Sequence, residues 1–228
     1  MNPRKHLSAK RLSAGFGRIE LLVMVFMCLI LVVPLLLSAM TRHEARSKRI
    51  ACANNLKSLG LVFKTWALDH GDKFPMSVDA QPGGSPGNSE PTEAYRYFQV
   101  MSPEFANPEV LICPADTRHP AKDLIRGFSN ANLSYFVGLD AADTNPQMLL
   151  LGDRNLTNGP LPPNRILVLN TNYPVGWSDK MHRGQGNIAL ADGSVQQYSR
   201  SRLREALLNG PAQVTQVNRA WTNRLVFP

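Results

Sequence analysis

The stretch "GFGRIELLVMVFMCLILVVPLL", residues 15–36, decides how the chain is built, because it is almost wholly apolar. Within residues 19–40, a run of 22, Glu20 is the one charged side chain. An α-helix needs roughly 20 such residues to cross a hydrocarbon core about 30 Å thick. The run is longer than the ~7 to 15 apolar residues of a secretory signal, and no Ala-x-Ala cleavage site follows it. We therefore predict a retained membrane-spanning helix with one carboxylate near its start.

The positive charge of the chain lies around this apolar run. The 228 residues carry a formal net charge of +8, and residues 1–49 hold nine Lys and Arg against two acids. Residues 50–228 hold 16 basic and 15 acidic side chains, so we expect no nucleic-acid partner. A short basic leader should stay in the cytoplasm while a long C-terminal part is translocated. We predict a single-pass inner-membrane protein with a cytoplasmic N-terminus and a periplasmic C-terminal domain.

The helical pattern continues beyond the membrane-spanning run. Apolar residues recur there at spacings of four and three, which places them on one helix face: Cys52, Leu56, Leu59, Phe63 and Trp66. Gly71 marks a helix end, and Pro75 prevents the helix from resuming. We predict one helix from about Phe16 to about Asp69, with a transmembrane half over 16–40 and an amphipathic half over 41–70. The segment 71–91, rich in Gly, Pro and Ser, should be a flexible loop.

Residues 92–228 should form an α+β head. Residues 92–101 have helical spacing, and four later β-prone runs are separated by turn residues, as in an antiparallel sheet: SYFVGL (134–139), MLLLGD (148–153), RILVLN (165–170) and GNIALADGSVQQYS (186–199). The last run predicts a hairpin whose two-residue turn, Asp192 and Gly193, needs positive φ at both positions. Leu190 and Val195 would then be cross-strand neighbours. The predicted fold class is α+β, with the second half of the long helix packed on a small antiparallel sheet.

The chain has three cysteines, too few for a disulfide scaffold, and no C-x-x-C pair that would indicate zinc. Cys52 belongs to the apolar helix face, and Cys113 ends a short apolar run before a proline. In an oxidising compartment two thiols that meet in one core would pair, so we favour a Cys52–Cys113 disulfide. The alternative is two independent buried thiols, since free cysteine is among the most buried residue types. Cys28 lies in the apolar run and should be a packing residue.

A basic leader that ends in Gly15, followed by Phe16, by Glu20 as the fifth residue from that Phe, and by the apolar run, resembles the type IV prepilin and type II secretion pseudopilin family. The resemblance implies cleavage of the leader, residues 1–15, by a prepilin peptidase between Gly15 and Phe16, with methylation of the new amine. It also implies that Glu20 meets the charged amine of a neighbouring subunit. A buried carboxylate kept for this purpose would set the register between adjacent helices.

A second segment, HRGQGNIALADG (182–193), resembles the His-x9-Asp-Gly element found in a large group of prepilin-type proteins, and residues 49–76 and LICPAD (111–116) resemble the same group. In this element His182, Asp192 and Gly193 have two interpretations. His182 and Asp192 are a metal or catalytic pair, or His182 is a cap that holds the hairpin in place. Asp153 and Asp179 could join Asp192 in a calcium site, although no EF-hand loop is present.

The resemblance implies a structural protein rather than an enzyme. It predicts a subunit that assembles with other pseudopilins into a periplasmic pseudopilus or pilus-like fibre linked to type II secretion, with the prepilin peptidase and an assembly ATPase as partners. No cofactor other than the calcium considered above is expected. Two alternatives stay open. One is a membrane-anchored periplasmic binding module that does not polymerise and uses the 77–91 loop or the Asp-rich turns. The other is a periplasmic hydrolase with His182 as general base, although the common hydrolase motifs are absent.

Overall fold

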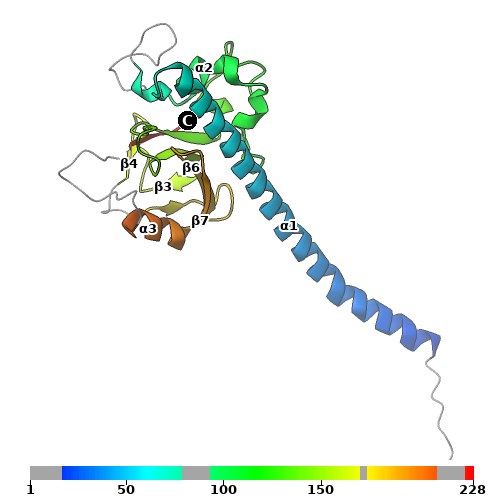
Figure 1. Ribbon diagram of the computed structural model, residues 1–228. Helices are drawn as coiled ribbons and strands as arrows, with labels where there is room; N and C mark the ends of the chain where they lie inside the picture. Colours follow the sequence, from blue (N-terminus) through cyan, green and yellow to red (C-terminus); the bar gives the residue numbers. More distant parts are fainter. Residues whose placement is uncertain (1–16, 79–92, 170–173, 210–223) are drawn as a thin grey trace, which may run out of the picture. The chain divides into compact units, whose positions relative to one another are not determined.

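The computed structural model describes residues 17–78, 93–169, 174–209 and 224–228. The chain divides into two compact units, residues 1–44 and residues 45–228. One helix, α1 (Arg18–Asp69), begins in the first unit and ends in the second (Figure 1). The second unit is α+β and contains a six-stranded antiparallel sheet. The predicted fold class, a long N-terminal helix with an antiparallel sheet, is confirmed.

The first part of α1 carries the apolar run. Its most apolar 18-residue window has a mean hydropathy of 3.0, and none of that window is buried in the structure. Among the described residues, α1 is the one helix that is long and apolar enough to cross a membrane. Exposed Leu, Val, Ile, Met and Phe side chains all around a helix are stable in lipid but not in water.

The second part of α1 packs against the sheet along the predicted face. Cys52, Leu56, Leu59, Phe63 and Trp66 are all buried, as the helical spacing predicted. The helix ends at Asp69, where the sequence placed its end. Gly71 follows with a φ of 66°, a left-handed conformation that glycine adopts without steric cost, and Asp72 donates its backbone N–H to the carbonyl of Ala67.

The segment after α1 differs from the predicted loop over 71–91. A 3-10 turn, η1 (Pro75–Ser77), follows the helix, and Phe74 is fully buried against Phe63 with ring centroids 6.1 Å apart. A buried aromatic side chain fixes the start of this segment to the core, which Gly/Pro/Ser composition did not reveal. Residues 79–92 lie outside the described part of the chain. The next elements are α2 (Tyr95–Val100), at the predicted helix, and the short turns η2 (Ser102–Glu104), η3 (Pro108–Leu111) and η4 (Asn130–Asn132).

The main sheet has the strand order β4-β8-β1-β2-β6-β7, and every neighbouring pair is antiparallel. Its strands are β1 (Tyr135–Gly138), β2 (Leu149–Asp153), β4 (Ile166–Val168), β6 (Gln185–Leu190), β7 (Val195–Ser199) and β8 (Arg224–Val226). A two-stranded sheet pairs β3 (Leu156–Thr157) with β5 (Gly176–Trp177). Helix α3 (Arg200–Asn209) follows β7 directly.

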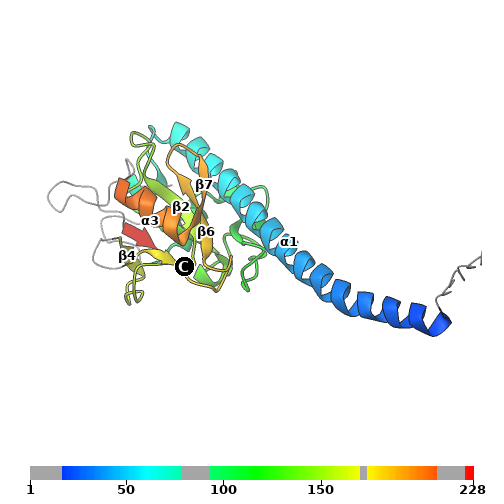
Figure 2. The ribbon, with the colours of Figure 1, turned by 90° about the horizontal axis from the view of Figure 1, so that it is seen from below.

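Side chains of the main sheet alternate between two hydrophobic clusters. On β1, Tyr135 and Val137 pack in the cluster that contains the α1 face, whereas Phe136 between them packs in the cluster of α3. This is the period-two alternation of a strand buried on both faces. The second part of α1 and helix α3 therefore cover opposite faces of the sheet (Figures 1 and 2).

The β6–β7 hairpin forms where it was predicted, but its turn is different. Leu190 donates its N–H to the carbonyl of Ser194 at 2.9 Å, which closes a three-residue loop, and within it only Gly193 has positive φ, 84°. A turn followed by one left-handed glycine is the usual three-residue hairpin loop. The extra residue shifts the register, so that Val195 pairs with Ala189 and not with Leu190. The predicted two-residue turn and its cross-strand pair are wrong.

Candidate functional site

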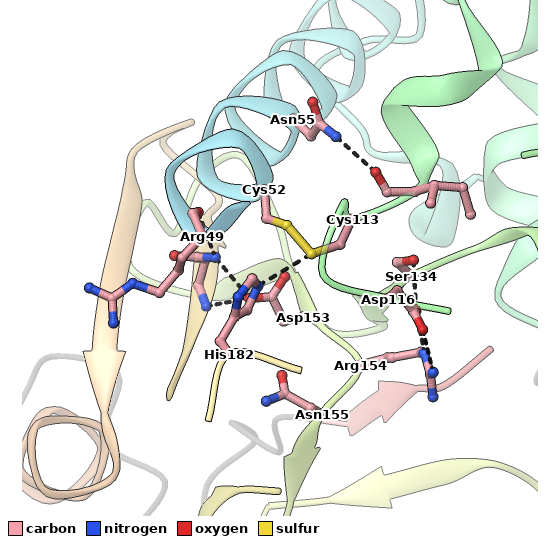
Figure 3. The surroundings of a disulfide bond; sticks show 12 residues. Arg49, Cys52, Asn55, Cys113, Asp116, Ser134, Asp153, Arg154, Asn155 and His182 are labelled. Atoms are coloured by element: carbon pink, nitrogen blue, oxygen red, sulfur yellow. Dashed lines mark hydrogen bonds and ion pairs between the residues drawn. A yellow bond between two sulfur atoms is a disulfide. The ribbon is translucent and has the colours of Figure 1, made fainter. Parts of the chain in front are cut away.

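Cys52 and Cys113 form a disulfide at the interface between α1 and the head. Both residues are fully buried, their Cα atoms are 5.0 Å apart, and they are separated by 61 positions in the chain. The turn η3 leads directly to Cys113, and Asn55, about one helical turn beyond Cys52, donates its side-chain amide to the carbonyl of Ile112 at 2.9 Å (Figure 3). A covalent bond and a hydrogen bond therefore link the same part of α1 to the same loop.

His182 points at this disulfide from the loop that precedes β6. Its Nε2 lies 3.3 Å from Sγ of Cys113 and 3.3 Å from Oδ2 of Asp153, and its side chain is 1% exposed (Figure 3). The backbone after it is left-handed at Arg183 and Gly184, with φ of 51° and 71°. These two residues reverse the chain so that His182 enters the interior while β6 begins at Gln185.

Asp153, at the end of β2, is a fully buried carboxylate beside His182. Its Oδ2 accepts the backbone N–H of Asn187 at 2.7 Å and the side-chain amide of Asn187 at 2.8 Å, whereas its Oδ1 has no hydrogen-bond partner among the described residues. Burial raises the pKa of the nearby Tyr135 hydroxyl well above its usual value, and the negative charge of Asp153 raises it further. Oδ1 of Asp153 is thus a buried acceptor without a donor among the described residues.

Cys52, Cys113, Asp153 and His182 form one compact cluster, here called the C2HD cluster. One potential ligand atom from each residue lies within 4.8 Å of the others. Within the described part of the chain it is the one group of three or more His, Cys, Asp or Glu side chains close enough to hold a metal ion. Sequence reasoning named all four residues but assigned them to three separate roles. The pattern Gly-Asp-Arg-Asn at the end of a buried strand was the signal that polar side chains enter the core there.

Arg154, the residue after Asp153, joins neighbouring segments. Arg154 makes a bidentate ion pair with Asp116, at 2.6 Å for both bonds, and Ser134 donates its hydroxyl to the same carboxylate at 2.8 Å. Burial acts to raise the pKa of Asp116, but the hydrogen bonds from Arg154 and Ser134 outweigh it, so the pKa lies below its usual value. Burial, with the charge of Arg154, lowers the pKa of the nearby Arg118 to about 10. The LICPAD segment therefore holds the head together through both Cys113 and Asp116.

The two ends of the His-x9-Asp-Gly element lie at opposite ends of β6. Six strand residues separate them, a length of about 20 Å. Asp192 is exposed and accepts the backbone N–H of Ser194 at 2.8 Å, which stabilises the hairpin loop. A methyl group placed on Gly60 of α1 would lie 3.7 Å from the Cα of Gly193. Gly193 thus lies beside α1 at Gly60, and nearer the start of β6 the side-chain amide of Asn187 donates to the carbonyl of Arg49 on α1 at 3.4 Å.

This geometry excludes one of the two interpretations of the His-x9-Asp-Gly element. His182 and Asp192 are not a metal or catalytic pair, because β6 separates them. The carboxylates proposed for calcium are not brought together either: Asp153 is buried in the C2HD cluster, whereas Asp179 and Asp192 are exposed and belong to no metal-ligand group among the described residues. The burial of His182 also argues against a general base, which must reach a substrate proton.

The residues predicted for processing and assembly are described only in part. Gly15 and Phe16 lie outside the described residues. Glu20 lies in the first turn of α1, exposed, and its Oε2 accepts the backbone N–H of Gly17 at 3.2 Å. A carboxylate at this position also interacts favourably with the positive end of the helix dipole. Glu20 therefore has a local role at the helix start in addition to any role between subunits.

Comparison of the chain with protein-family models, with curated proteins and with solved structures found no match. The class of protein is therefore described from its own structure. One helix is long and apolar enough to span a membrane, and a buried disulfide binds the second part of that helix to an α+β head.

Proposed function

We propose that the protein is a pilin-like structural subunit, anchored in the inner membrane with a cytoplasmic N-terminus and a periplasmic head. Subunits assemble through α1 into a pseudopilus-type fibre that serves protein secretion, after a prepilin peptidase has removed residues 1–15. Other pseudopilins and an assembly ATPase are its partners. The observation that carries the proposal is the continuity of α1, whose apolar first part and buried second part belong to one helix of 52 residues.

The carboxylate of Glu20 supports assembly rather than simple anchoring. A charged group among apolar side chains costs a few kcal/mol on insertion into a bilayer, and such groups are retained mostly where they have a partner. The hydrogen bond from Gly17 occupies one oxygen of Glu20. Among the ion pairs of the described residues, none joins a cation to this carboxylate. The amine of a neighbouring subunit would neutralise this charge at one axial position only, which fixes the register of the helices.

The head supports a mechanical role. A fibre subunit must transmit force from its membrane helix to its exposed domain, and a helix held only by apolar contacts can slide along its partner. Here the disulfide, the Asn55 hydrogen bond to Ile112 and the Asn187 hydrogen bond to Arg49 all oppose sliding of α1 along the sheet.

Two experiments test the proposal. The first is mass analysis of the N-terminus of the protein from its native membrane, for which we expect a chain that starts at methylated Phe16. An intact Met1 would contradict processing. The second compares Glu20→Gln with the matched control Glu44→Gln, which removes a carboxylate outside the apolar run. We expect chemical cross-linking in membranes to give ladders of copies for wild type and Glu44→Gln, and monomers for Glu20→Gln, with all three inserted.

A non-polymerising binding module is the second candidate, because the head contains a cavity of about 260 Å³. Its lining includes Arg154, Lys180 and the apolar side chains of Leu156, Leu167 and Phe227. Because Asp116 already pairs with Arg154, Lys180 is the cation that, beside these apolar walls, suits an amphipathic anion. This candidate predicts that Glu20→Gln leaves cross-linking and localisation unchanged, whereas Lys180→Gln weakens ligand binding.

A further inference from the structure

The C2HD cluster has the composition of a metal site as well as that of a disulfide. Two thiolates, one imidazole and one carboxylate are the ligand types that zinc takes in four-coordinate sites. All four side chains come from different segments: α1, the loop after η3, the end of β2 and the loop before β6. The cytosol in which a chain is synthesised keeps cysteines as thiols, so these residues exist in the thiol form before any disulfide forms.

We infer that, in the thiol form of the protein, Cys52, Cys113, Asp153 and His182 bind one zinc ion. Binding releases the two thiol protons and involves no electron transfer: Zn²⁺ and two cysteine thiols give a zinc ion held by two thiolates, with two protons passed to solvent. The zinc form and the disulfide form exclude each other, since the disulfide has no thiolate. Conversion of the disulfide to thiols needs two electrons from an external dithiol or phosphine.

Two of the spacings between ligand atoms already fit a tetrahedral site, and all four atoms lie within 4.8 Å of one another. With bonds of about 2.0 Å to nitrogen or oxygen and 2.3 Å to sulfur, the ligand atoms of a zinc site lie about 3.3 to 3.8 Å apart. Nε2 of His182 lies 3.3 Å from Sγ of Cys113 and 3.3 Å from Oδ2 of Asp153. The two sulfurs would separate from a bonded distance of about 2 Å to about 3.7 Å, a movement that rotation about the cysteine Cα–Cβ bonds provides.

One buried carboxylate oxygen of the cluster lacks a hydrogen-bond donor. Sγ of Cys113 and Oδ2 of Asp153 both face Nε2 of His182, a nitrogen that carries at most one proton. Oδ1 of Asp153, fully buried, has no partner in the described part of the chain, which is costly for a carboxylate. A zinc ion would neutralise these acceptors together. Asn187 orients the carboxylate through two hydrogen bonds to Oδ2, which leaves Oδ1 as the oxygen free to bind the ion.

The two sulfur ligands favour zinc over harder cations. Calcium and magnesium bind oxygen, whereas thiolate and imidazole favour zinc among the common divalent ions without redox chemistry. The inference goes beyond the proposed function and does not depend on it, because all four ligands lie within the compact unit of residues 45–228 and binding requires neither cleavage nor assembly.

The test uses the full-length protein in detergent, kept without oxygen and reduced with a phosphine. After equilibration with ZnCl₂ and removal of the excess, elemental mass spectrometry should find about one zinc per chain, and none in the oxidised protein. Co²⁺ in place of zinc should give the visible bands of tetrahedral cobalt and thiolate-to-cobalt charge-transfer absorption. The urea midpoint of the reduced protein should rise with zinc and fall with EDTA. If the reduced chain unfolds without metal, zinc should restore its folded state, which the same titration detects.

Single substitutions test which side chains bind the zinc ion. His182→Gln and Asp153→Asn each keep both cysteines, and we expect each to weaken zinc binding more than 10-fold, because loss of an outer partner alone typically costs about 10- to 100-fold. Asp179→Asn and Asp192→Asn are the matched controls, since these exposed carboxylates lie outside the cluster, and they should bind as wild type does. No zinc in the reduced protein, or zinc binding unaffected by both His182→Gln and Asp153→Asn, overturns the inference.

Discussion

Removal of the Cys52–Cys113 disulfide should destabilise the head by a calculable amount. The bond closes a loop with a sequence separation of 61, and a cross-link of this length removes about 14 cal/mol/K of entropy from the unfolded chain. At 25 °C this corresponds to about 4 kcal/mol of the free energy of unfolding. The double variant Cys52→Ala/Cys113→Ala should lose this stabilisation, because its unfolded state regains the full loop freedom.

The measurement is urea unfolding of the full chain in detergent with EDTA present, followed by tryptophan fluorescence. Trp66 and Trp177, 4% and 1% exposed, report on the α1 side and the α3 side of the sheet. With a denaturant slope of about 2 kcal/mol/M, a loss of 4 kcal/mol lowers the urea midpoint by about 2 M. The urea midpoint of the wild-type protein should fall by the same amount when the protein is reduced with a phosphine in the presence of EDTA.

Cys28→Ala is the matched control, since Cys28 is a free, exposed cysteine in the apolar part of α1. It should leave the midpoint unchanged. A shift below about 0.5 M for the double variant would refute the reasoning, because it would place the loop-closure contribution under roughly 1 kcal/mol. The same conclusion would follow if Cys28→Ala shifted the midpoint as far as the double variant does.

Two further predictions concern packing and charge. Gly186→Ala should lower the free energy of unfolding by about 1–3 kcal/mol in urea titrations, because the new methyl would lie 2.3 Å from the buried ring of Trp177; Gly60→Ala, whose methyl meets only ordinary contacts, should not. Stability should fall as the pH drops through the lowered folded-state pKa of Asp116, since the ion pair with Arg154 is complete only above the unfolded-state pKa, and the acid dependence should be weaker in Asp116→Asn.

Local periodicity was enough to predict the elements that depend on it. The spacing of Leu56, Leu59 and Phe63 placed the buried face of α1, and Gly71 placed its end, because both features follow from helix geometry within a few residues. Five of the strands, β1, β2, β4, β6 and β7, fall in the four β-prone runs for the same reason. The pairing of Cys52 with Cys113 followed from a count of cysteines and an assumed compartment, which is a weaker basis than periodicity.

What the sequence did not reveal depends on contacts between distant segments. Strand β8 lies between β4 and β1 in the sheet, although only three residues form it and nothing local marks them as a central strand. The hairpin loop was predicted one residue too short, because Asp-Gly occurs in both two- and three-residue turns. His182 was linked to Asp192 by the spacing of a motif, whereas its partner in space is Asp153, 29 positions before it in the sequence.

The C2HD cluster can hold α1 to the head both before and after the cysteines are oxidised. Either state joins α1 to the head at Cys52, and both use Cys113, so a chain can pass from the thiol form to the disulfide form without releasing the helix. A metal-bound head would already hold the α1 face against the sheet when the cysteines reach an oxidising compartment. An external disulfide that takes two electrons from the thiolates and releases the zinc ion would then act on two sulfurs within about 4 Å of each other, which favours the native pair over a bond with Cys28.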